Sequence, residues 1–130
     1  MARPTVDVVV PFRGDRAALE QLRHRLSVLR LGPRDTVTIV DNSARAVDGV
    51  AADGRIAVLR APWRRTHWRT PGHARNSGAR QGHGEWVVFL DADTAPRADL
   101  LERFFEPPPA EDTALLAGGV IDEEVPHDAR

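Results

Sequence analysis

The sequence predicts an α/β domain built on a mainly parallel sheet with helices on both faces. Short runs rich in β-branched residues alternate along the chain with segments of helical periodicity, which implies right-handed crossovers between parallel strands. Three of the apolar runs also end in polar or charged turns. Because ligands bind outside the carboxyl ends of the strands in such sheets, we expect these turns to share one edge and form a site there.

Four strands are expected along the chain. The run TVDVVVP, Thr5 to Pro11, is rich in β-branched residues and predicts a buried strand that ends at Pro11. The other three predicted strands are Thr36 to Val40, Arg55 to Leu59 and Trp86 to Leu90. One more strand is considered within Thr113 to Ile121.

Three helices are expected between or after these strands. Leucines at three- and four-residue spacing predict an amphipathic helix over Arg16 to Leu31, with Asp15 as its N-cap and Gly32-Pro33 as its end. A second helix is predicted over Gly72 to Gly82, where small residues at four-residue spacing would allow close packing: Ala74, Gly78 and Gly82. The third predicted helix, Arg97 to Phe105, would end before three consecutive prolines, Pro107 to Pro109.

Length and composition indicate one globular domain. With 130 residues, the chain can bury a core, and we expect the domain to cover residues 1–121 and an acidic tail to cover 122–130. The absence of cysteine excludes disulfides and thiolate metal sites, and the absence of lysine excludes any mechanism that needs a catalytic lysine. The longest apolar run, Val8 to Phe12, is too short to span a membrane.

Charge is distributed unevenly along the chain. Met1 to Leu90 holds 15 arginines against 8 acidic residues, whereas Asp91 to Arg130 holds 3 arginines against 11 acidic residues. Since the acidic part offsets the basic part, we do not expect nucleic acid to be a partner.

Two carboxylates, Asp91 and Asp93, follow the apolar run that begins at Trp86. Hard cations such as Mg²⁺ or Mn²⁺ prefer oxygen ligands and often take one or two carboxylates together with substrate phosphates. A bare Asp-x-Asp is also typical of a solvated turn that caps the next helix. The buried strand before it and the matching turns elsewhere favour a metal site.

Two other regions carry candidate ligand contacts. Asp41 ends the second predicted strand, where an acid commonly accepts hydrogen bonds from a ribose hydroxyl or a base N–H, although alone it is more often a turn residue. Arg60 to His83 holds six arginines and no acidic residue, which for most of them indicates a solvated basic face. Arg75, at the start of the second predicted helix, is suited to a diphosphate because helix N-termini and forked guanidinium groups both favour anions.

Three segments, in order along the chain, resemble the nucleotide-sugar-binding half of family 2 glycosyltransferases of the GT-A fold. They are VDVVVPFRGD, TVTIVDNSA and PGHARNSGARQGHGEWVVFLDADTAP. The resemblance covers about Val6 to Phe105. It implies a Rossmann-like domain that binds a nucleotide-diphosphate sugar for inverting transfer to an acceptor hydroxyl on a glycan, a lipid or a small molecule. It also implies a cytoplasmic location, with peripheral association at the inner membrane face as an alternative.

The resemblance assigns roles to matching residues. Pro11, Phe12 and Arg13 would line the nucleobase, Asp41 would accept from the base or ribose, and Arg75 would lie near the base or diphosphate.

The carboxylate turn is assigned in the same way. Asp91 would contact the ribose or the metal, Asp93 would ligate Mg²⁺ or Mn²⁺, and Ala92 between them belongs to the nucleotide-sugar site.

Two departures limit the resemblance. The Tyr-Asn that is common after the first strand's Pro-x is Arg13-Gly14 here, and the family's catalytic base lies well downstream of Asp-Ala-Asp. Acidic residues near the end of the sequence do not match the base motif: Glu123, Glu124 and Asp128. The chain therefore resembles a donor-binding half that ends before the acceptor region.

Two alternative functions are kept. VVFLDADTA is also similar to the first motif of haloacid-dehalogenase-type phosphatases, although Ala95 stands where that motif has Thr or Val, and the lysine of that family is absent. A non-catalytic fragment that binds a nucleotide sugar, or serves only in protein interaction, is the second alternative.

Overall fold

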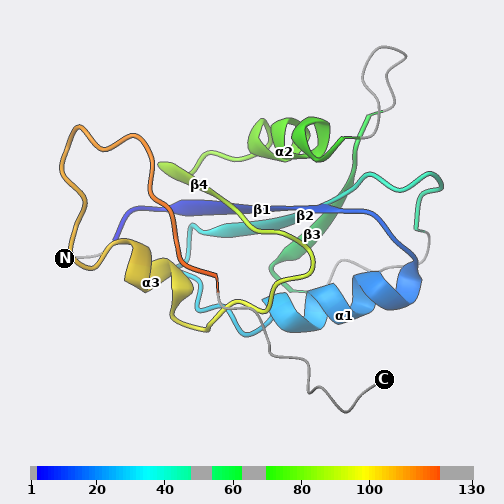
Figure 1. Cartoon of the computed structure of the whole chain (residues 1–130), viewed down its shortest axis with the longest axis horizontal. Helices are drawn as coiled ribbons and strands as arrows, with labels where there is room; N and C mark the ends of the chain where they lie inside the picture. Colours follow the sequence, from blue (N-terminus) through cyan, green and yellow to red (C-terminus); the bar gives the residue numbers. More distant parts are fainter. Residues whose placement is uncertain (1–2, 48–53, 63–69, 121–130) are drawn as a thin grey trace.

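The computed structural model describes residues 3–47, 54–62 and 70–120. Four parallel strands form one sheet in the order β3-β2-β1-β4. The strands are β1 (Val6–Phe12), β2 (Thr36–Asp41), β3 (Ile56–Arg60) and β4 (Trp86–Phe89). The helices are α1 (Arg16–Leu26), α2 (Pro71–Ala79) and α3 (Leu100–Phe104). The predicted α/β class with a parallel sheet is confirmed, and α2 covers one face while α1 and α3 cover the other (Figure 1).

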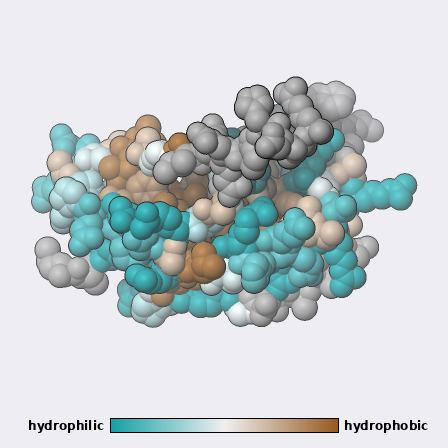
Figure 2. Space-filling model, turned by 60° about the horizontal axis from the view of Figure 1, so that its bottom comes forward, coloured by the Kyte–Doolittle hydropathy of each residue, from teal (hydrophilic) through white to brown (hydrophobic). Residues whose placement is uncertain are grey.

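The larger part of the core lies between the sheet and the layer of α1 and α3. Alternate residues of each strand point into it, because side chains in a strand alternate between the two faces. Leu19, Leu22 and Leu26 of α1 pack against these strand residues and are almost fully buried, as the leucine spacing predicts. From the side of these helices the surface is mostly hydrophilic, with apolar side chains gathered mainly toward one end (Figure 2).

The α2 layer is thinner and depends on small residues. Val9 of β1 and Val40 of β2 form a small buried cluster with Ala74 of α2. A Cβ on Gly78 would lie 2.4 Å from Val9 Cγ1 and 2.8 Å from Val40 Cγ2, so this helix can sit on the sheet only with glycine there. The predicted close packing of Ala74 and Gly78 is therefore observed, while Gly82 lies beyond the helix, where a Cβ would collide with Asp7.

The first helix is shorter than predicted. It ends at Leu26, not at Leu31, and the Ser27 hydroxyl donates to the His24 carbonyl oxygen at 2.6 Å. Leu29 nevertheless stays buried, because a turn joins its N–H to the Leu26 carbonyl. The leucine spacing thus reports burial correctly, but a helix followed by a buried turn produces the same spacing.

The predicted bounds of the third helix and the additional strand near the end of the chain are also wrong. The third helix is only Leu100–Phe104. The strand considered within Thr113 to Ile121 is absent over residues 113–120, where Leu115 and Val120 are 84% and 78% exposed and so have no neighbouring strand to pack against. Ile121 and the predicted acidic tail, 122–130, lie outside the described residues.

The amino ends of the strands are held by buried carboxylates. Asp35, before β2, accepts hydrogen bonds from the Val6 and Gly32 N–H groups and forms an ion pair with Arg3, with Oδ2 and the guanidinium 2.6 Å apart. Burial raises the pKa of Asp35, but these hydrogen bonds lower it by more, so the net pKa lies below 3.8. Because this network lies at the amino edge of the sheet, Asp35 and Arg3 take no part in a site at the opposite, carboxyl edge.

Candidate functional site

A pocket of about 210 Å³ opens at the carboxyl edge of the sheet, between the ends of β1 and β4 and the start of α2. Its position is the point where the strand order reverses, since β1 leads outward to β2 while β4 returns to the other side of β1. The lining residues are Pro11, Phe12, Arg13, Asn42, Pro71, Arg75 and Asp91.

Pro11 explains why the sheet opens there. The strand does not end at Pro11 as predicted, since Pro11 pairs with Val40 and the strand continues through Phe12. Val9 accepts from the Leu90 N–H, so Pro11, two residues later, also faces β4. Proline has no N–H to extend this ladder, so the chain after β4 leaves the sheet, and Asp91 reaches the edge of the pocket.

Arg75 and Asp91 join the two sides of the pocket. Arg75 lies one turn into α2, whose N-terminus is capped by the Thr70 hydroxyl accepting from the His73 N–H. Its guanidinium donates to Asp91 Oδ1 at 3.1 Å, and the two side chains are 36% and 67% exposed. The pocket therefore presents this cation and carboxylate to a ligand, with a second cation, Arg13, also in its lining.

Asp41 is placed differently from the other predicted site residues. It is 3% exposed, and its carboxylate accepts from the Ser43 and Val47 N–H groups, with Arg60 at 3.4 Å. Burial raises its pKa, but these hydrogen bonds and the charge of Arg60 lower it by more, so the net pKa lies below 3.8. In the structure its carboxylate stabilises the turn after β2, and a role toward base or ribose stays a prediction.

Asn42 and Ser43 organise the pocket in a way that the sequence motifs did not reveal. The Asn42 amide donates to the Thr70 carbonyl at 3.0 Å, which ties the β2 turn to the start of α2. The Ser43 hydroxyl accepts from the Gly14 N–H and donates to the Gly14 carbonyl oxygen, which ties it to the β1 turn. Their position directly after Asp41 could have predicted these contacts, because turns at the carboxyl ends of adjacent parallel strands lie close together.

The carboxylate turn carries the donors that a hard cation would need. A β-turn runs from Asp91 to Thr94, with the Thr94 N–H donating to the Asp91 carbonyl at 3.2 Å. Asp91 and Asp93 are both exposed at this turn. Among residues 3–47, 54–62 and 70–120, no three acidic or histidine side chains form a metal cluster. Two carboxylates fit a Mg²⁺ or Mn²⁺ ion that takes its other ligands from phosphates and water.

Five predicted residues line the pocket together: Pro11, Phe12, Arg13, Arg75 and Asp91. Ala92, Asp93 and Asp41 lie beside it on the same edge without lining it. Three arginines of the predicted basic segment lie outside the described residues: Arg64, Arg65 and Arg69. Of the described chain, no helix has the length and apolar composition needed to cross a membrane.

Comparison with known proteins identifies relatives of this chain. Residues 7–127 match the family described as Glycosyl transferase family 2. The pre-mycofactocin glycosyltransferase of Mycobacterium tuberculosis, in strains CDC 1551 / Oshkosh and ATCC 25618 / H37Rv, is 36% identical over 100 residues, which is 75% of this chain. The chain spans 19% of the length of these curated relatives.

Solved structures show the same fold. Staphylococcus aureus TarS, as residues 1–349, superposes with a TM-score of 0.55 at 20% identity, covering 76% of this chain and 30% of TarS 1–349. The mannosyltransferase PcManGT from Pyrobaculum calidifontis, in complex with GDP-Man and Mn²⁺, superposes with a TM-score of 0.52 at 25% identity, covering 75% of this chain and 30% of that protein. These neighbours are GT-A glycosyltransferases, so the predicted fold class is confirmed.

Proposed function

Because this chain belongs to glycosyl transferase family 2, we propose that it binds a nucleotide-diphosphate sugar with a divalent cation for inverting transfer of the sugar to an acceptor hydroxyl. The observation that carries the proposal is the meeting of Arg75 and Asp91 across the pocket at the reversal of the strand order. A cation on one wall and a carboxylate on the other suit a ligand that has a diphosphate and a metal.

Different residues of the chain contact different parts of the nucleotide. The turn Pro11-Phe12-Arg13 lines the nucleobase, beside the β2 turn that the Asp41 carboxylate stabilises. Arg75 leaves Asp91 and donates to a diphosphate oxygen, where its charge and the positive end of α2 act in the same direction. Asp91 contacts the ribose or the metal.

Asp91 and Asp93 would hold the cation, with Mg²⁺ and Mn²⁺ as the candidates. When bound, the cation neutralises the charge that develops on the leaving nucleoside diphosphate. The complex of PcManGT with GDP-Man and Mn²⁺ supports a sugar donor and a metal of this kind for the present chain.

The base that activates the acceptor hydroxyl is proposed to belong to another segment of a longer protein. Within the described residues, Asp91 is the one acidic side chain that lines the pocket, and it already has a role toward the ribose or metal. A non-catalytic binding fragment remains the alternative function, and turnover by a longer protein carrying this segment distinguishes the two. A cytoplasmic location stays a prediction, with peripheral association at the inner membrane face as its alternative.

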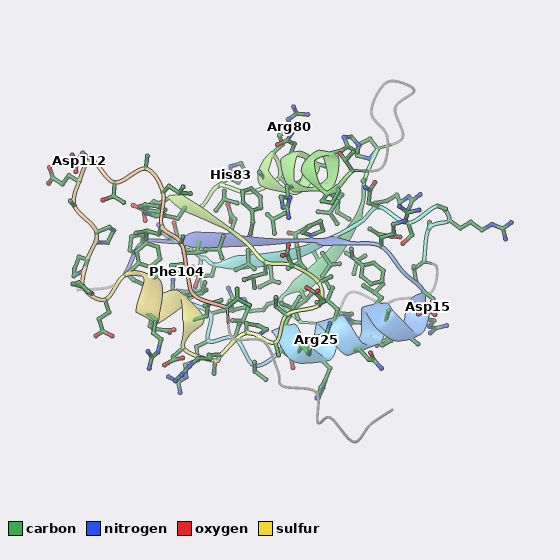
Figure 3. All side chains as sticks on the ribbon, in the orientation of Figure 1. Asp15, Arg25, Arg80, His83, Phe104 and Asp112 are labelled. Atoms are coloured by element: carbon green, nitrogen blue, oxygen red, sulfur yellow. The ribbon has the colours of Figure 1, made fainter. Side chains whose placement is uncertain are left out.

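Isothermal titration calorimetry of the chain with UDP, GDP and TDP, with and without Mn²⁺, tests the proposal. We expect at least one nucleotide to bind more tightly with Mn²⁺, and Asp93→Ala to remove this gain. Asp112→Ala is the matched control, because Asp112 is an exposed carboxylate on a distant loop (Figure 3). Binding by the wild type that is independent of metal would contradict the role of Asp93.

A further inference from the structure

Arg25 of α1 binds the backbone of the carboxylate turn from the side opposite to α2. Its Nε donates to the Thr94 carbonyl oxygen at 3.2 Å, and its terminal nitrogen donates to the Ala92 carbonyl oxygen. These partners lie 69 and 67 residues away in the sequence. In Figure 3 Arg25 projects from α1 toward the segment that follows β4.

The turn is thus held from two sides. On the α1 side its carbonyl groups accept from Arg25, and the Arg30 N–H donates to the Ala98 carbonyl at 3.0 Å, so the following segment is attached to the same end of the helix. On the α2 side the Asp91 carboxylate accepts from Arg75. With its carbonyl groups bound toward α1, the turn directs Asp91 toward the pocket.

We propose that Arg25 is a positioning residue for the Asp91–Asp93 turn. By holding this turn, Arg25 sets the affinity of the site for its divalent cation, although Arg25 itself contacts neither the cation nor the nucleotide. This inference rests on the proposed function, because the proposed function requires the metal that Arg25 would help to bind. Neighbouring leucines of α1 fix the helix against the sheet, so Arg25 can act as a rigid support.

Arginine is suited to this position for a geometric reason. Two carbonyl oxygens two residues apart require donors in a fixed plane, and the forked guanidinium provides them. A lysine would keep the charge and reach one carbonyl at a time, while a methionine would keep the apolar stem and donate nothing. Arg25→Lys and Arg25→Met therefore separate the charge from the geometry.

The chain contains a matched control for a loop-binding arginine. Arg55 donates to the Gly32 carbonyl at 2.6 Å and also to the Asp35 carbonyl, so it too joins two carbonyls of one loop. This contact lies at the amino edge of the sheet, opposite the pocket. Arg55→Met removes a comparable pair of carbonyl contacts, both made by one terminal nitrogen, without touching the carboxylate turn.

Two measurements decide the proposal. In Mn²⁺ titrations of the nucleotide complex, we expect Arg25→Met to weaken metal affinity by about tenfold or more, as loss of groups that orient metal ligands commonly does. Nucleotide affinity without metal should change much less, because Arg25 binds the carbonyl groups of Ala92 and Thr94, which do not line the pocket. Arg25→Lys should lie between, and Arg55→Met should match the wild type in both.

Hydrogen exchange of the Thr94 amide is the second measurement, since this amide closes the turn on Asp91. Arg25→Met should speed its exchange by about tenfold relative to Arg55→Met, because the turn opens more often without its clamp. Unchanged Thr94 exchange in Arg25→Met overturns the positioning role, whether or not the wild type binds metal. Failure of the wild type to bind nucleotide with metal would instead contradict the proposed function.

Discussion

Arg75 on α2 donates a 3.1 Å hydrogen bond to Asp91 in the turn after β4, which closes an ion pair across the proposed nucleotide pocket. A diphosphate competes with Asp91 for the same guanidinium, and a cation competes with Arg75 for the same carboxylate. Binding of the diphosphate and the cation together would exchange one ion pair for two new interactions. Each ligand should therefore raise the affinity of the site for the other.

Replacing Arg75 tests the diphosphate contact. We expect Arg75→Met to weaken binding of a nucleoside diphosphate by about 10- to 100-fold, since a hydrogen bond to a charged group contributes about 1.5–3 kcal/mol. The nucleoside without phosphates should lose little, and calorimetry with both ligands measures the difference. Equal losses for the two ligands would place Arg75 at the base instead of the diphosphate.

Replacing Asp91 tests the exchange from the other side. Asp91→Asn removes a negative charge near the diphosphate and releases Arg75, so nucleotide affinity without metal should rise or stay level. The gain on adding Mn²⁺ should fall, because one proposed metal ligand is lost. A variant that keeps the full gain would show that Asp91 does not contribute to the metal site.

Gly78 tests the packing that brings α2 over the sheet. Gly78→Ala should lower the free energy of unfolding by about 1–3 kcal/mol, because the added Cβ collides with two valines and overpacking costs this much. Gly72→Ala in the same helix is the control, since its Cβ would meet only the Thr70 hydroxyl at 3.8 Å. Urea unfolding of both variants measures the difference, and equal stabilities would contradict the observed close approach.

Asp35 tests the network at the amino edge. Asp35→Asn should lower the free energy of unfolding at pH 7 by about 3 kcal/mol, because it leaves the half-buried Arg3 without its counter-ion. The folded-state pKa of Asp35 lies below 3.8, so its carboxylate stabilises the fold above that pH, and the contribution is lost as the pH falls through the folded pKa.

Unfolding measured from pH 7 to pH 2 checks this dependence. Stability of the wild type should fall more steeply below about pH 4 than that of Asp35→Asn. Asp112→Asn should keep the slope of the wild type, since Asp112 is exposed. Parallel curves for the wild type and Asp35→Asn would show that other carboxylates dominate acid unfolding.

The local pattern of residues was sufficient to predict the α/β class, the four strands and the edge that carries the pocket. β-branched runs, leucine spacing and an Asp-x-Asp after an apolar run are local properties, and the family motifs occur in order along the chain. Helix ends were less predictable, since Leu29 is buried both in a continued helix and in the turn that the structure contains.

Contacts between distant segments required the tertiary structure. Only the crossover of α2 brings Arg75 to Asp91, and only the packing of α1 brings Arg25 to a turn almost 70 residues later. The inward hydrogen bonds of Asp41 likewise depend on how its own turn closes. The sequence by itself determined which turns reach the carboxyl edge, because the apolar runs that form the strands are local features, even though β1 continues one residue past Pro11. Their partners were decided by the geometry of the crossovers, which no local pattern contains.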